Sequence, residues 1–206
     1  ALIRLSQFNA NATDDLRESI QAAEKAGATS LVLDLRNNPG GLLEQAVRVT
    51  SQFLDGGNVL QEADAEGNVR AYEVRPGGIA TEIPMVALIN AGSASSAEIL
   101  AGALQDYDRA ELVGETTFGT GTVLEPFVLE DGSALMLGTR QWLTAEGRTI
   151  RKQGVAPDEE VILSVAADLL SADELEEMTA QEVLDSEDAQ LLKALELLGE
   201  LPVATE

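Results

Sequence analysis

The sequence of 206 residues contains neither histidine nor cysteine. The lack of cysteine excludes disulfide bonds and thiolate metal sites, and it leaves the redox compartment undetermined. The lack of histidine means that any serine nucleophile in this chain must give its proton to another kind of base. Aromatic residues make up only 3% of the chain, so few large rings are available for a core or a binding pocket.

Basic residues are also scarce. Lysine and arginine number 13 against 36 acidic residues, which gives a formal net charge of −23, and the lysines are Lys25, Lys152 and Lys193. Such a charge repels phosphate backbones and anionic membrane surfaces, so we do not expect a nucleic-acid partner. No apolar run is long enough to cross a membrane. The hydrophobic content of 45% is sufficient for one well-packed domain.

Strand-like and helical patterns alternate along the chain. Continuous apolar runs at 30–35 and 84–90 predict central strands that are buried on both faces. This alternation predicts an α/β fold with a largely parallel sheet and added β-hairpins. We expect a core domain over residues 1–165 and a helical extension over 166–206 that packs on it. Further strands are predicted at 3–8 and 112–113, and hairpins at 59–74 and 123–142. Helices are predicted from Asn11 or Thr13 to Gly27, from 42 to 54, and from the serine cluster to 106, and a last helix is predicted to be capped by Ser186.

Two of the predicted strand ends carry polar and glycine-rich segments, at 34–41 and 90–96. Functional groups of open α/β sheets gather at the carboxyl ends of strands. Paired glycines let a backbone N–H point outward, and the N-terminus of a helix favours a developing negative charge. Together the two segments can form an oxyanion hole beside a serine hydroxyl, as acyl transfer requires. The alternative interpretation is a tight turn next to a serine that caps a helix.

Three segments, in this order, resemble the C-terminal processing (tail-specific) peptidases: LVLDLRNNPGGLL, NAGSASSAEILAGALQDYDRAELVGETTFGTGTV and GRTIRKQGVAPD. The resemblance covers nearly the whole chain. It implies a serine peptidase with a Ser–Lys dyad, a core similar to the ClpP/crotonase fold, and a polypeptide substrate cut near its C-terminus. It further implies no cofactor and no metal, a PDZ domain upstream of this segment, and a location outside the cytoplasm.

The resemblance also assigns roles to residues. The nucleophile that would form an acyl-enzyme falls on Ser95, and the backbone N–H of Ser96 would line the oxyanion hole. The second oxyanion donor would be Gly40 or Gly41, and the motif does not distinguish between them. Ser93 would have a structural role.

The loop that supplies the family's lysine departs from the pattern, because Thr120 stands at the dyad position. Leu124 replaces the glutamine that orients the lysine. A threonine hydroxyl cannot accept the serine proton as a neutral lysine does. The two changes are consistent with a member that uses a different base, a lineage that lost peptidase activity, or an engineered knockout. The change at Leu124 favours natural divergence.

Other residues can be considered for the missing base. Lys152 lies in a family-like segment near the cleft, although it can equally be a solvated surface charge. Asp106 and Glu115 are acids near the loop, and we expect them to cap a backbone group or pair with Arg109 instead. Glu98 follows Ser95 at helical spacing and is expected to have a structural role.

Two further patterns have competing interpretations. The acidic residues from Glu62 to Glu73 mimic the ligand spacing of a calcium loop, but their strand-like flanks indicate a hairpin turn. The aromatic residues near the motifs can form peptide-binding pockets or simply belong to the core; they are Tyr107, Phe118, Phe127 and Trp142.

Three functions are therefore compared. The first is a serine endopeptidase of the C-terminal processing kind. The second is a peptide-binding homologue that has lost the base. The third, an acyl-CoA enzyme of the related crotonase fold, depends on fold analogy alone.

Overall fold

The computed structural model describes residues 1–164 and 167–201, and these contain two β-sheets. The first sheet is parallel and consists, in spatial order, of β1 (Leu2–Arg4), β2 (Leu31–Asp34), β5 (Met85–Ile89), β6 (Glu111–Gly114) and β9 (Glu159–Glu160). The second is antiparallel and consists of β4 (Val69–Glu73), β3 (Asn58–Ala63), β8 (Ala134–Leu143) and β7 (Thr122–Val128). This arrangement confirms the predicted α/β class with a mostly parallel sheet and added hairpins.

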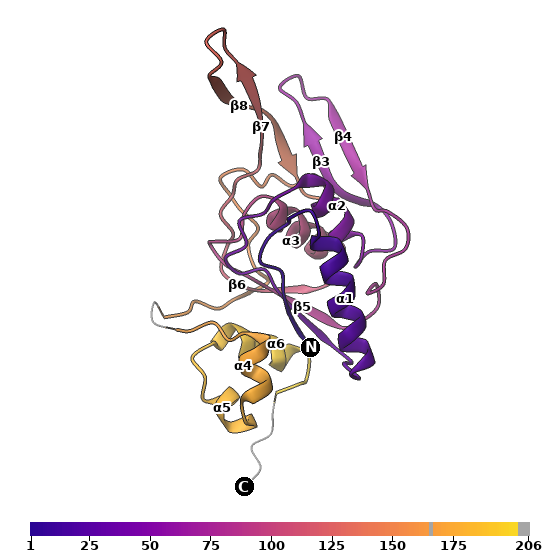
Figure 1. Cartoon of the computed structure of the whole chain (residues 1–206), viewed down its shortest axis with the longest axis vertical. Helices are drawn as coiled ribbons and strands as arrows, with labels where there is room; N and C mark the ends of the chain where they lie inside the picture. Colours follow the sequence, from indigo (N-terminus) through magenta and orange to yellow (C-terminus); the bar gives the residue numbers. More distant parts are fainter. Residues whose placement is uncertain (165–166, 202–206) are drawn as a thin grey trace.

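Helices cover both faces of the parallel sheet (Figure 1). The helices are α1 (Ala12–Lys25), α2 (Leu43–Thr50), α3 (Ser96–Asp106), α4 (Ala172–Glu177), α5 (Ala180–Leu184) and α6 (Ala189–Leu197). None of the helices in the described part of the chain is both long and apolar enough to span a bilayer.

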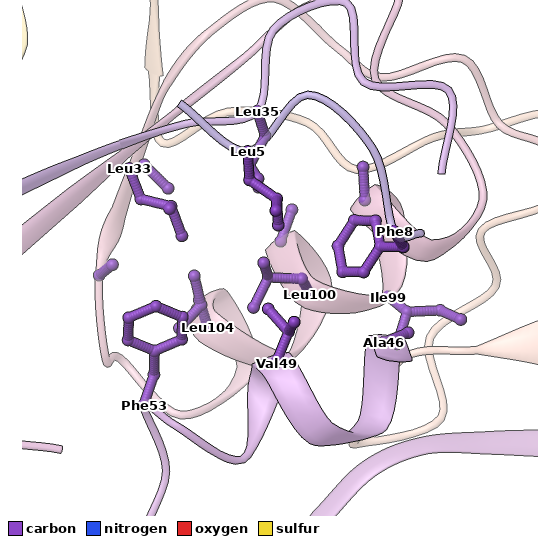
Figure 2. Packing of buried hydrophobic residues seen from close by; sticks show 14 of the residues in the cluster. Leu5, Phe8, Leu33, Leu35, Ala46, Val49, Phe53, Ile99, Leu100 and Leu104 are labelled. Carbon is purple, nitrogen blue, oxygen red and sulfur yellow. The ribbon is translucent and has the colours of Figure 1, made fainter. Parts of the chain in front are cut away.

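Alternate residues of the central strands enter two separate cores. Leu31 and Leu33 of β2 pack with the residues of α1, α2 and α3, and Figure 2 shows this larger cluster around Leu100 and Phe53. The intervening Val32 packs on the other face, where it joins residues of β5, β6 and α6. Because strand side chains alternate between faces, this double covering explains the continuous apolar runs of the sequence.

The antiparallel sheet extends away from this core (Figure 1). The acidic segment from Glu62 onward forms the β3–β4 hairpin, as predicted, and Asp64 accepts backbone N–H groups of its turn. Glu62 is buried and bonds to the Tyr72 hydroxyl at 2.6 Å and to Arg140. Its carboxylate is therefore used within the sheet.

Several predicted boundaries were wrong. The first strand ends at Arg4 rather than 8, because the chain then turns to pair Phe8 with Gly41. Helix α2 ends at Thr50 rather than 54, and strand β9 was not predicted. Helix α6 is capped by Asp188 rather than Ser186. The predicted boundary between a core and an extension, at 165 and 166, lies outside the described residues.

Candidate active site

Ser95 lies where β5 ends and α3 begins, at the carboxyl end of a central strand. Its backbone has φ 56° and ψ −115°, a conformation that residues with a side chain rarely adopt. A strained turn between a strand and a helix is the device by which some hydrolases expose a serine nucleophile. Ser95 is half-buried, whereas Ser93 and Ser96 are buried.

The glycine turn after β2 packs directly against this serine. Gly40 has φ +92°, and a Cβ added there would lie 2.7 Å from the Cβ of Ser95 and 2.8 Å from the N of Ser96. Only glycine fits such a position without displacing the helix start. The Ser96 hydroxyl donates to the Gly41 carbonyl at 3.0 Å, and the Ala94 N–H donates to the Asn38 carbonyl at 2.9 Å. The structure thus brings the two predicted segments together.

The N–H groups of Gly40 and Gly41 differ in whether they have an acceptor. The Gly40 N–H donates to the side-chain oxygen of Asn38 at 2.8 Å. The N–H groups of Gly41 and Ser96 have no acceptor within the ranges that the structure describes. Ser96 is also the first residue of α3, where the helix dipole is positive. Among the described residues, two donors without acceptors therefore lie next to the close contact between the turn and Ser95.

A buried carboxylate fixes the other flank of Ser95. Glu98 is fully buried, and its Oε2 accepts the N–H of Ser95 at 2.8 Å and the N–H of Thr120 at 3.0 Å. Its Oε1 accepts the Thr117 hydroxyl at 2.7 Å and the Gly119 N–H at 2.6 Å. Glu98 therefore anchors the 117–120 loop beside the serine. Its importance was underestimated, although the Ser-x-x-Glu spacing of a capping box was visible in the sequence.

Thr120 and Leu124 occupy different environments. Thr120 is half-buried, and the anchor holds its backbone near Ser95 without using its side chain. Leu124 is 56% exposed on β7. The exposed Lys152 donates its backbone N–H to the Gly119 carbonyl at 2.9 Å, so it lies against the same loop.

Of the acidic candidates, Asp106 has its carboxylate engaged away from Ser95. Of the two roles expected for Asp106, the structure shows the capping of a backbone group, because Asp106 accepts the Glu146 N–H at 2.8 Å; its ion pair is with Arg148 and not with Arg109. Arg109 instead donates to backbone carbonyls, and burial lowers the pKa of its guanidinium. Glu115 bonds through its backbone N–H to the carbonyl of β5 residue Ile89.

The aromatic residues divide between core and surface. Trp142 is buried and makes an edge-to-face contact with Tyr72, with 6.4 Å between ring centroids. Tyr107 accepts the Asn58 N–H at 2.8 Å, and Phe127 lies half-exposed on β7. Phe118 is 70% exposed, although its backbone N–H donates to the Ser93 carbonyl at 3.0 Å. Among these rings, that of Phe118 belongs to the anchored 117–120 loop itself and exposes apolar surface there.

A family model and several known proteins match most of this chain. The model of peptidase family S41 matches residues 1–161. The carboxyl-terminal-processing protease of Synechocystis sp. is 42% identical over 159 residues, which are 77% of this chain and 37% of that protein. The carboxy-terminal processing protease CtpA of Bacillus subtilis is 40% identical over 156 residues, which are 75% of this chain and 33% of that protein. The chain thus spans about a third of the length of these relatives.

A solved structure agrees with these matches. The photosystem II D1 C-terminal processing protease superposes with a TM-score of 0.74 at 38% identity, over 78% of this chain and 42% of that chain. The predicted family resemblance and the predicted fold are therefore confirmed. The residues beyond 161 lie outside the family match.

Proposed function

Since this chain belongs to peptidase family S41, a family of serine hydrolases, we propose that it is a serine endopeptidase core that cleaves polypeptides near their C-termini. The relatives support the substrate class, because their names describe carboxyl-terminal processing. The observation that carries the proposal is that, among the described residues, the N–H groups of Gly41 and Ser96 have no acceptor and lie next to the contact between the glycine turn and Ser95.

In the proposed reaction, the hydroxyl oxygen of Ser95 attacks the scissile carbonyl carbon and its proton passes to a base. The carbonyl oxygen becomes an oxyanion, which accepts hydrogen bonds from the N–H groups of Gly41 and Ser96. Expulsion of the amine leaves an acyl-enzyme, and water then releases the acid and restores the hydroxyl. Gly41 is preferred to Gly40 as the donor, since the Gly40 N–H is already bonded to Asn38.

A serine-directed fluorophosphonate tests the nucleophile. We expect the probe to label the protein at Ser95, and we expect the labelling to vanish in Ser95→Ala. Ser6→Ala, a change at an exposed serine, is the matched control and should be labelled like the parent protein. Labelling that persists in Ser95→Ala would contradict the assigned nucleophile.

The second function, a peptide-binding homologue without catalysis, is favoured by Thr120 alone. The double variant Thr120→Lys with Leu124→Gln should raise the rate of peptide cleavage, by about 10²–10⁴-fold if the lysine acts as a general base. Leu124→Gln alone is the control and should leave the rate unchanged. Peptide binding by the parent protein without labelling or cleavage would support the second function.

Lys152 is the proposed base if the parent protein does cleave. Its backbone lies against the loop that carries Thr120, and a neutral lysine can accept the serine proton. Lys152→Met should then abolish cleavage, whereas Lys25→Met, a change at an exposed lysine of α1, should not. Equal rates in the two variants would exclude Lys152 as the base.

Three broader features also remain proposals. These are a core domain over 1–165 with a helical extension over 166–206, an upstream PDZ domain, and a location outside the cytoplasm. The family resemblance supports them, as do the relatives, which extend well beyond the matched segment. Detection of the full-length protein in an extracytoplasmic fraction would test the location.

A further inference from the structure

We infer that Asp188, at the start of α6, is a positioning residue for the glycine turn and acts on it through Arg36. Asp188 lies in the C-terminal helical segment, outside the residues that the family model matches. Arg36 lies between the end of β2 and the turn that carries Gly40 and Gly41. The inference depends on the proposed role of that turn as part of the oxyanion hole.

The contact between the two segments is a buried network of charges. The guanidinium of Arg36 donates to both carboxylate oxygens of Asp188, at 2.6 and 2.9 Å, and to both oxygens of Asp34, each at 2.9 Å. All three side chains are fully buried. Arg4 adds a second cation on Asp34, at 2.8 Å. Two cations and two anions therefore balance, and removal of Asp188 would leave one buried positive charge uncompensated.

The fold fixes Asp188 as firmly as it fixes Arg36. The carboxylate of Asp188 also accepts the N–H groups of Leu170 and Leu191, each at 3.1 Å, and the second of these caps α6. The apolar face of α6 packs on the parallel sheet through Leu191 and Ala194. Docking of the C-terminal segment therefore presents a rigid carboxylate to the buried guanidinium of Arg36, whose Nη1 also donates to the side-chain oxygen of Gln190 at 3.3 Å.

The turn that follows Arg36 also bonds to its neighbours: Asn37 exchanges hydrogen bonds with the Asn90 side chain, and the Gly40 carbonyl accepts the Phe8 N–H at 2.9 Å. The Asn38 side chain donates to the Leu5 carbonyl at 2.5 Å and accepts the Gly40 N–H, and the Asn38 carbonyl accepts the Ala94 N–H. A shift of Arg36 toward solvent would move Asn37 and Asn38, to which it is covalently joined. The Gly41 N–H, which has no acceptor to hold it within the described ranges, would move with them.

The test compares Asp188→Asn with Asp185→Asn. Both variants remove one carboxylate charge from the C-terminal segment, but Asp185 is exposed and bonds only to Gln181 among the described residues. We expect Asp188→Asn to reduce the maximal rate of fluorophosphonate labelling (kinact) by up to the ~10²–10³-fold that loss of one oxyanion donor costs. The probe's KI should not change, because the binding surface remains. Asp185→Asn should match the parent protein in both constants.

Amide hydrogen exchange gives a readout that is independent of catalysis. In Asp188→Asn, exchange at Gly40 and Ala94 should accelerate by a larger factor than exchange at Ala87 in β5, which reports the loss of overall stability. A role in overall stability alone would accelerate all three amides by the same factor and would overturn the inference. Unchanged exchange at Gly40 and Ala94, with unchanged kinact, would also overturn it.

Arg36→Lys decides the question if Asp188→Asn does not fold. Lysine keeps the positive charge but cannot donate to two carboxylates in the planar geometry of arginine. The same fall in kinact and the same local exchange are expected, and parent-like values would overturn the inference. If the parent protein is not labelled at all, the peptidase proposal fails, and amide exchange alone then judges the role of Asp188.

Discussion

The two segments that flank Ser95 are each anchored to a fully buried carboxylate, but by different means. The 117–120 loop is held by Glu98, which accepts hydrogen bonds from neutral N–H and hydroxyl groups. The glycine turn is held through Arg36, which forms ion pairs with Asp34 and Asp188. The first anchor lies within 22 residues of the loop in sequence, whereas the second joins positions 152 residues apart.

This difference bears on which parts of the site tolerate change. Glu98 holds Thr120 through its backbone, so the loop keeps its conformation whatever side chain stands at 120. The ion-pair anchor of the turn depends on a distant segment, because one of the two carboxylates on Arg36 is supplied by Asp188 at the start of α6. Loss of that charge would affect the turn without any change in its own sequence.

The largest effect is expected from Asp188→Ala. It leaves the Arg36 guanidinium buried and short of one partner, which costs about 3–5 kcal/mol in the free energy of unfolding. Urea denaturation measures this cost. Asp185→Ala, the exposed control, should change the free energy by less than about 0.5 kcal/mol. Equal stability of the two variants would show that the ion pair contributes nothing.

A smaller effect is expected from Glu98→Gln. In the parent protein, each carboxylate oxygen of Glu98 accepts hydrogen bonds from two donors. The glutamine amide keeps one acceptor oxygen, but its NH₂ group takes the place of the other oxygen and would therefore face two donors without an acceptor. An unsatisfied buried donor costs about 1–3 kcal/mol, which urea denaturation of the variant should reveal. Glu111→Gln, a change at an exposed glutamate of β6, is the control. A loss larger than that of Asp188→Ala would reverse the proposed ranking of the two anchors.

The sequence predicted the parts of the site that depend on local patterns. The apolar runs identified β2 and β5, and the glycine and serine motifs at their ends identified the turn and Ser95. Glu98 was visible as a capping residue, but its bonds to the 117–120 loop depend on how the chain folds back. Strand β9 has only two residues, too few for a periodic pattern.

The anchor at Asp188 was not predictable in the same way. It depends on an ion pair with Arg36, which lies 152 residues away in the sequence. The acidic tail contains many carboxylates, and nothing in the sequence shows which of them pairs with Arg36. The expected cap of the last helix, Ser186, is two residues away from the residue that performs this role. The proposed preference for Gly41 over Gly40 likewise depends on the bond between Gly40 and Asn38, which no motif encodes.

The smallest effect is expected from Thr120→Lys. If the loop is held by its backbone, this change should leave the free energy of unfolding within about 0.5 kcal/mol of the parent value, as is usual for sites without special features. Gly119→Ala is the matched contrast, because a Cβ there would lie 3.0–3.2 Å from backbone atoms of 152–154 at φ +82° and would strain the loop. A large loss in Thr120→Lys would mean that the threonine side chain itself supports the loop, and the loop would then resemble the turn in depending on a specific partner.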